Sequence, residues 1–159
     1  MTAPVAIAQA FAIFENPYNL AKLTPGWLNF KVISPAVEMH AGAEIEYVIR
    51  WLGLPVHWKT RITAYDPPHG FVDEQEKGPY TLWRHQHFLK EISGGTEISD
   101  CVTYELPLGI AGQVAHGLLV KRQLLEIFRF RQHAVQQLLG VHGVRFDNPV
   151  IAESAGLHS

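Results

Sequence analysis

Apolar residues recur at helical spacing near both ends of the chain. Residues 4–15 place hydrophobic side chains three and four positions apart, and Asn16-Pro17 ends that pattern. Residues 18–23 can add a second short helix before the next proline. Residues 110–139 carry a broad apolar stripe, with most of their charged side chains away from it. The pattern therefore predicts two short N-terminal helices and one long C-terminal helix.

Between these helices the hydrophobic period changes to two, which is typical of strands with one buried face. Short turns rich in glycine and proline separate the alternating runs. Six strands are predicted, over residues 28–34, 44–52, 56–65, 71–77, 80–91 and 96–106. Strands that follow one another through short turns form an antiparallel meander. The expected α+β architecture is a curved antiparallel sheet wrapped around the long helix, with a pocket between the two.

Composition narrows the class of protein. The 159 residues are 47% hydrophobic and 18% charged, which indicates one globular domain over residues 1–144, followed by a tail over residues 145–159. The net charge of −2 leaves no basic surplus for nucleic acid. No apolar run reaches the roughly 18 residues that a membrane span needs, and the N-terminal segment lacks the basic start of a signal peptide. A cytoplasmic protein with no nucleic-acid partner and no membrane span is predicted.

Five short segments carry a resemblance to a known family. They are Asn16-Pro17-Tyr18-Asn19-Leu20, Thr24-Pro25-Gly26-Trp27-Leu28-Asn29-Phe30, Phe71-Val72-Asp73-Glu74-Gln75, Gly78-Pro79-Tyr80 and Trp83-Arg84-His85-Gln86-His87. In them the chain resembles the START-like, helix-grip superfamily, also called SRPBCC or polyketide cyclase/dehydrase, and within it a bacterial ligand-binding branch. The resemblance spans roughly residues 4–139 and implies a helix-grip fold with a cavity. It implies less about chemistry, because one scaffold serves lipid carriers, hormone receptors, cyclases and ring-hydroxylase subunits.

One family feature is expected to be missing. The family usually has a further strand before the first helix, next to the last strand of the sheet, but here Met1 lies almost at the predicted helix. The strand over residues 96–106 would then have an open edge, which favours pairing with another chain. A homodimer through this edge is the resulting expectation. Simple loss of the strand and a wrongly assigned start codon are the alternatives.

Strand alternation also predicts which side chains face the cavity. The inward face is aromatic with a few polar groups, as in small-molecule pockets. The predicted ligand-binding residues are Trp27, Tyr47, Trp58, Asp73, Gln75, Trp83, His85, His87, Asp100 and Tyr104. The first hypothesis is therefore a protein that binds a hydrophobic small molecule, such as a lipid, a polyketide or an aromatic metabolite.

Two other functions fit the same residues. A cyclase or dehydratase could use His85 or His87 as its general acid or base, oriented by Asp73 or Asp100. An interaction protein could act through the exposed sheet edge instead of the pocket. A network of inward polar groups that only bridges neighbouring strands is the structural alternative to either catalysis or ligand anchoring.

The histidine pair also raises the question of a metal. His85 and His87 are two positions apart, so they face the same way on a strand and can chelate. With Gly78 and Glu91 they approximate the first cupin motif, but the spacing from glycine to histidine is off by one. A long helix after the sheet does not suit the cupin jelly roll. The sequence prediction is therefore that the protein holds no metal and no cofactor.

Overall fold

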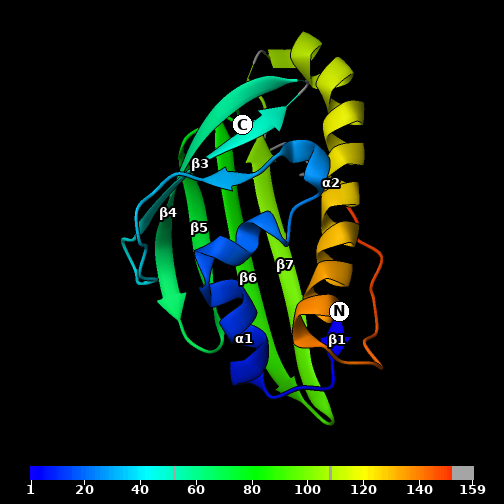
Figure 1. Ribbon diagram of the computed structural model, residues 1–159. Helices are drawn as coiled ribbons and strands as arrows, with labels where there is room; N and C mark the ends of the chain where they lie inside the picture. Colours follow the sequence, from blue (N-terminus) through cyan, green and yellow to red (C-terminus); the bar gives the residue numbers. More distant parts are fainter. Residues whose placement is uncertain (52, 108, 152–159) are drawn as a thin grey trace, which may run out of the picture.

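The computed structural model describes residues 1–51, 53–107 and 109–151. Seven strands form one antiparallel sheet in the order β1-β7-β6-β5-β4-β3-β2, and the long helix α2 (Gly109–Leu139) runs along its concave side (Figure 1). The strands are β1 (Thr2–Ala3), β2 (Lys31–Val32), β3 (Glu44–Trp51), β4 (Leu54–Asp66), β5 (Gly70–Lys77), β6 (Leu82–Ile92) and β7 (Gly95–Glu105). This arrangement confirms the predicted curved sheet that grips a C-terminal helix.

The N-terminal helices are shorter than the pattern suggested. Helix α1 spans Ile7–Glu15, and the second predicted helix is a 3₁₀ turn, η1 (Pro17–Ala21). The first predicted strand, over residues 28–34, is a second 3₁₀ turn, η2 (Gly26–Leu28), followed by the two residues of β2. Asn29 adopts a left-handed conformation, with φ +43°, and ends η2, so the extended backbone begins only after it, where alternation had suggested a continuous strand.

The expectation that the strand before the first helix is absent is wrong. Thr2 pairs with Glu97 and Ala3 with Thr96, so β1 precedes the first helix and lies beside β7. The amino group of Met1 also donates to the Ile98 carbonyl at 2.9 Å. A strand of two residues is too short to show a period of two, which is why the sequence pattern missed it.

The segment after α2 returns to β1. Arg145 pairs with Thr2 through two main-chain hydrogen bonds of 2.9 Å. The Asp147 carboxylate lies 2.7 Å from the amino group of Met1. Figure 1 shows this segment in orange and red beside the lower end of α2. The chain beyond the long helix therefore holds β1 in place against β7.

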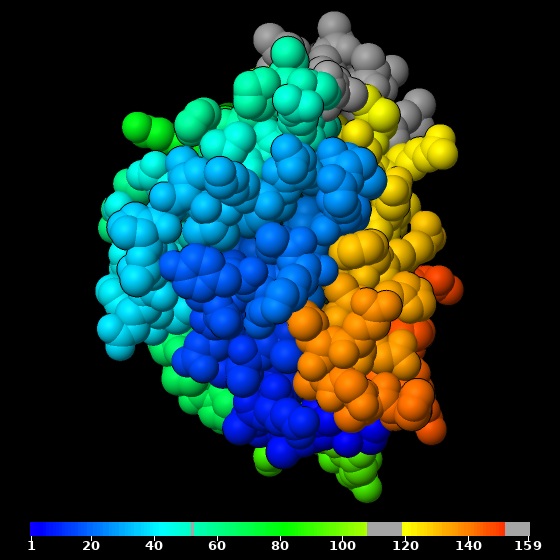
Figure 2. Space-filling model, in the orientation of Figure 1, coloured from blue at the N-terminus to red at the C-terminus, as the bar shows by residue number. Residues whose placement is uncertain are grey.

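Helices α1 and α2 close the concave face of the sheet. The buried stripe of α1 is formed by Ile7, Ala10, Phe11 and Phe14, which recur at helical spacing. Figure 2 shows the N-terminal segment in blue packed against α2 in yellow and orange. No described helix is long and apolar enough to cross a membrane. The two helices enclose the core in which the candidate site lies.

Candidate functional site

A cavity of about 160 Å³ lies between the concave face of the sheet, the η1–η2 segment and α2. Its walls are mostly aromatic and aliphatic. The aromatic rings that line it include Phe30, Tyr47, Trp58, Phe71, Trp83 and Phe128. Tyr47, Trp58 and Trp83 therefore lie where strand alternation predicted.

These aromatic side chains contact one another across three strands, β3, β4 and β6, and the segment between η2 and β2 that carries Phe30. Tyr47 stacks between Phe30 and Trp58, with ring centroids 4.5 and 5.7 Å away. Trp58 meets Trp83 edge to face at 5.3 Å. Burial and the charge of Asp73 raise the pKa of the Tyr47 hydroxyl well above its ordinary value. Tyr47 is therefore a neutral hydrogen-bonding group at physiological pH.

Two tryptophans connect the rim of the cavity to α2. Trp27 on η2 donates from Nε1 to Glu126 Oε1 at 2.9 Å, and it remains 42% exposed while lining the cavity. Trp51 at the end of β3 donates to Gln123 Oε1 at 2.8 Å. Both acceptors lie on the same face of α2, one turn apart. The helix is therefore held over the cavity by hydrogen bonds as well as by packing.

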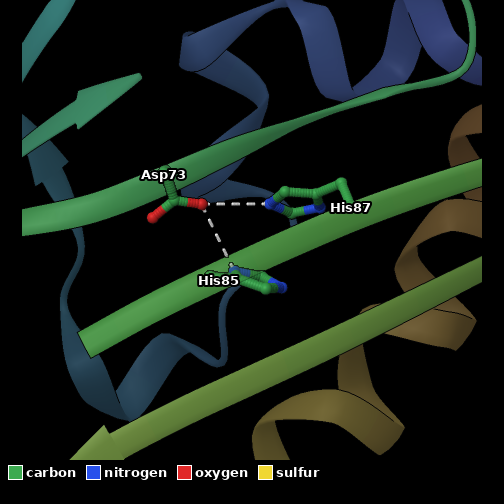
Figure 3. Close-up of side chains that lie close together, drawn as sticks. All are labelled: Asp73, His85 and His87. Atoms are coloured by element: carbon green, nitrogen blue, oxygen red, sulfur yellow. Dashed lines mark hydrogen bonds and ion pairs between the residues drawn. The ribbon is translucent and has the colours of Figure 1, made fainter. Parts of the chain in front are cut away.

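A cluster of two histidines and two aspartates forms the polar end of the site. Asp73 on β5 pairs in register with His85 on β6, and His87 pairs with Asp100 on β7. Because all four side chains point to the concave face, each imidazole lies between two carboxylates. Asp73 and the two histidines line the cavity, and their ligand atoms all lie within 4.8 Å of one another (Figure 3).

The distances within this cluster are short and differ between its two ends. His85 Nε2 lies 2.9 Å and His87 Nδ1 lies 3.0 Å from Asp100 Oδ1. The other two nitrogens face Asp73 Oδ2, at 3.5 Å from His85 Nδ1 and 3.2 Å from His87 Nε2. Both imidazole side chains are at least nine-tenths buried, with 6% and 7% exposed. Asp100 as a whole residue is exposed on β7, but its side chain is only 19% exposed.

Burial and charge shift the pKa of each group in a different direction. Burial alone would raise the pKa values of both aspartates, but the hydrogen bonds and charges of the histidines lower them, most strongly for Asp100. Burial and the nearby His87 lower the pKa of His85. Burial opposes the proton on His87 as well, but Asp100 and Asp73 together raise its pKa. Of the two rings, His87 therefore holds a second proton more strongly.

Arg131 is a site residue that the sequence analysis missed. It lies on α2, lines the cavity, and places Nη1 3.7 Å from Asp100 Oδ1 with a side chain 11% exposed. Its guanidinium carbon lies 5.1 Å from the centre of the Phe128 ring. The available signal was a charged residue within the apolar stripe, between Phe128 and Val135 at helical spacing.

Three predicted site residues lie away from the cavity wall. Among the described residues, Gln75, Asp100 and Tyr104 are not part of the cavity lining. The Gln75 amide donates to the Tyr80 carbonyl at 2.7 Å and accepts from the Tyr80 amide at 3.3 Å, which closes the turn between β5 and β6. Tyr104 packs its ring edge to face against Tyr80 at 5.8 Å. Asp100 contacts the site through the two histidines. Cys101 is exposed, as predicted.

The fold and this site place the chain among proteins with the helix-grip fold, and the comparisons agree. A solved structure of TTHA0849 from Thermus thermophilus matches with a TM-score of 0.70 and 14% identity over 91% of this chain and 96% of that one. Protein NE0264 from Nitrosomonas europaea matches with a TM-score of 0.65 and 14% identity, over 88% and 90% of the two chains. Ara h 8.0201, a helix-grip protein, matches with a TM-score of 0.59 and 16% identity over 89% and 95%. At such low identity these likenesses show the fold alone.

No family model matches the chain, and no curated protein matches it.

Proposed function

We propose that the protein binds a hydrophobic small molecule in the cavity between the sheet and α2. The observation that carries this proposal is an aromatic cavity of about 160 Å³ with polar groups gathered at one end. Apolar walls with a few converging polar groups are typical of small-molecule sites. The helix-grip fold supports the finer resemblance to the SRPBCC superfamily and its polyketide cyclase/dehydrase-like branch, which is part of the same proposal.

Two buried donors on the cavity wall indicate the chemistry of the ligand. Among the described residues, three buried nitrogens lack a hydrogen-bond partner: Trp58 Nε1, Arg131 Nε and His87 Nδ1. The first two are always donors, and their side chains line the cavity. Buried donors are nearly always paired, because an unpaired one costs about 1–3 kcal/mol. A ligand with an apolar ring system and a carbonyl or carboxylate oxygen would supply the acceptor.

Native mass spectrometry of the protein purified from its host tests this proposal, with organic extraction of any bound molecule. We expect a discrete adduct that carries at least one oxygen acceptor, because the buried donors favour such a group. The dye anilinonaphthalene sulfonate provides a second, defined probe. Leu124→Trp, which fills the cavity from α2, should weaken its binding at least about tenfold, or about 1.4 kcal/mol.

Leu119→Trp is the matched control, since Leu119 lies on the same helix and is 38% exposed. It should bind the dye as the unmodified protein does. Two results together would contradict a ligand cavity. One is a measured mass equal to that of the chain alone, and the other is equal dye binding by the unmodified protein, Leu124→Trp and Leu119→Trp.

A cyclase or dehydratase is the second candidate function, because His87 and Asp73 both line the cavity and form a hydrogen-bonded pair at 3.2 Å. A protonated His87 at the cavity wall could act as a general acid toward a ligand carbonyl. Conversion of the extracted molecule by the protein would favour this candidate. In that case His87→Gln should retain binding and lose conversion.

We also propose that a second copy pairs with the open part of the β7 edge. Strand β1 covers β7 only near Thr96 and Glu97, and no described strand pairs with the outer edge of residues 99–105. Exposed strand edges favour pairing with another chain. Light scattering after size-exclusion chromatography should give twice the chain mass of 17.8 kDa. A mass that stays monomeric across a concentration series would contradict the dimer.

A further inference from the structure

In the histidine–aspartate cluster, the close contacts between nitrogen and oxygen outnumber the N–H groups of two neutral imidazoles. Four imidazole nitrogens face carboxylate oxygens at 2.9–3.5 Å. Two neutral imidazoles carry only two N–H groups, and ionised carboxylates carry none. Two of the four contacts would therefore bring a nitrogen lone pair toward an oxygen lone pair. A second proton on His87 relieves one of these two contacts, and a metal ion bound at one end of the cluster relieves both.

Asp100 Oδ1 lies close to one nitrogen of each ring. It forms a hydrogen bond with His85 Nε2 at 2.9 Å and lies 3.0 Å from His87 Nδ1, a buried nitrogen that has no hydrogen-bond partner. Arg131 Nη1 lies 3.7 Å from the same oxygen, which makes that end unfavourable for a second cation. When the His87 proton lies on Nδ1 instead of Nε2, both nitrogens that face Asp73 Oδ2, His85 Nδ1 and His87 Nε2, present lone pairs toward it (Figure 3).

We propose that Asp73, His85 and His87 bind a divalent transition-metal ion of the Zn²⁺ class at the cavity wall. The ligand atoms are 3.2 and 3.5 Å from Asp73 Oδ2. Ligands about 2.0–2.2 Å from a tetrahedral zinc are separated by about 3.3–3.6 Å, which is close to the two separations between histidine and aspartate. The ligand atoms of all three residues lie within 4.8 Å of one another. Imidazole with carboxylate favours zinc, cobalt, nickel or copper over calcium and magnesium.

The surroundings of the three ligands support a metal site. Metal-bound histidines usually donate their second N–H to a carboxylate, which is the position of Asp100. Thr60 Oγ1 donates to the other oxygen of Asp73 at 3.4 Å. Phe71 stacks on His87 with centroids 4.1 Å apart, and Phe128 meets His85 edge to face at 5.6 Å. The rings are thus fixed in orientation, and the remaining coordination positions face the cavity.

This inference departs from the sequence prediction that the protein holds no metal. The sequence showed that two histidines lie on one face of a strand. It did not show that Asp73 faces one nitrogen of each imidazole ring and that Asp100 faces the other nitrogen of each ring. That arrangement depends on the register of β5, β6 and β7, which places Asp73 opposite His85 and Asp100 opposite His87.

Metal titration of the chelator-treated full chain tests the proposal without reference to any organic ligand. Calorimetry with Zn²⁺ should give one ion per chain, and Co²⁺ should give the visible absorption of a tetrahedral site. Asp73→Asn removes one charged ligand with little change of shape, so stoichiometric binding should be lost. Asp100→Asn should weaken binding about 10–100-fold, because the second N–H partner of the histidines is altered.

His57→Gln is the matched control, since His57 is exposed on β4 and should leave the affinity unchanged. If Asp73→Asn fails to fold by circular dichroism, His87→Gln replaces it and should also lose stoichiometric binding. Absence of stoichiometric Zn²⁺ binding by the folded natural chain would overturn the proposal, as would equal binding by the folded ligand variants. Neither result bears on the dye and mass-spectrometry tests of the cavity.

Discussion

Replacing Asp100 with alanine is expected to lower the free energy of unfolding by about 3–5 kcal/mol, because it removes one partner of a buried charged network. Asp100 Oδ1 contacts His85 Nε2 and His87 Nδ1 at 2.9 and 3.0 Å, with a side chain only 19% exposed. Without this carboxylate, Arg131 would also be buried without its ion-pair partner. Urea denaturation at neutral pH, followed by circular dichroism, measures the change.

Glu97→Ala is the charge-matched control for this prediction. Glu97 lies on the same strand, but it is exposed, so its replacement should change the free energy of unfolding by less than about 0.5 kcal/mol. A similar small change in Asp100→Ala would show that the cluster contributes little to stability.

Acid should reproduce part of the effect of Asp100→Ala. The pKa of Asp100 in the folded protein lies well below its ordinary value, because the histidines favour its charged form against the effect of burial. The unfolded chain therefore binds this proton more readily than the folded protein does. Asp100 contributes stability above its unfolded pKa of about 3.9, and this is lost as the pH falls through the folded pKa. The alanine variant should lose less stability than the natural chain over that acid range.

Replacing Gly70 with alanine is expected to lower the free energy of unfolding by about 3–5 kcal/mol, from backbone strain and a steric clash together. Gly70 has φ +149°, and a Cβ there would lie well inside van der Waals contact with the His87 carbonyl oxygen. Since that oxygen belongs to the main chain of β6, the clash would push β5 and β6 apart beside the histidine cluster. Thermal and urea unfolding measure the loss.

Gly94→Ala separates the two contributions. Gly94 also has a positive φ, +89°, but a Cβ there would meet no atom within 4 Å. Its replacement should cost only the backbone strain, about 1–2 kcal/mol. Equal losses in the two variants would show that β6 can move to accommodate the new methyl group, and the close approach at Gly70 would then carry no special cost.

The local pattern of hydrophobic and polar residues was sufficient to predict most of the helices and strands. Alternation predicted β3 to β7 because each strand buries one face, and the long apolar stripe predicted α2 because only one side of that helix packs on the sheet. The same alternation predicted that His85 and His87 point inward, and both side chains are buried. Pattern failed for β1 and β2, which have two residues each and so cannot display a period.

Only the tertiary structure shows which residues lie opposite one another on neighbouring strands. From the sequence, either aspartate could have oriented either histidine. In the structure each histidine contacts both aspartates, because strand register sets which residues lie opposite one another and this depends on pairing across the whole sheet. Arg131 comes to the cluster from α2, 31 positions after Asp100 along the chain. No local sequence pattern shows that Arg131 and Asp100 lie side by side in the folded protein.

The sequence by itself determined a curved antiparallel sheet around a long C-terminal helix and an inward face of aromatic, histidine and aspartate side chains, because burial imposes periodicity on most of the regular elements. Only the tertiary structure decided that β1 covers part of the β7 edge, that Gln75 closes a turn, and that Asp73 faces one nitrogen of each histidine. These features depend on contacts between residues far apart in the chain, and they exist only once the sheet has paired and α2 has packed against it.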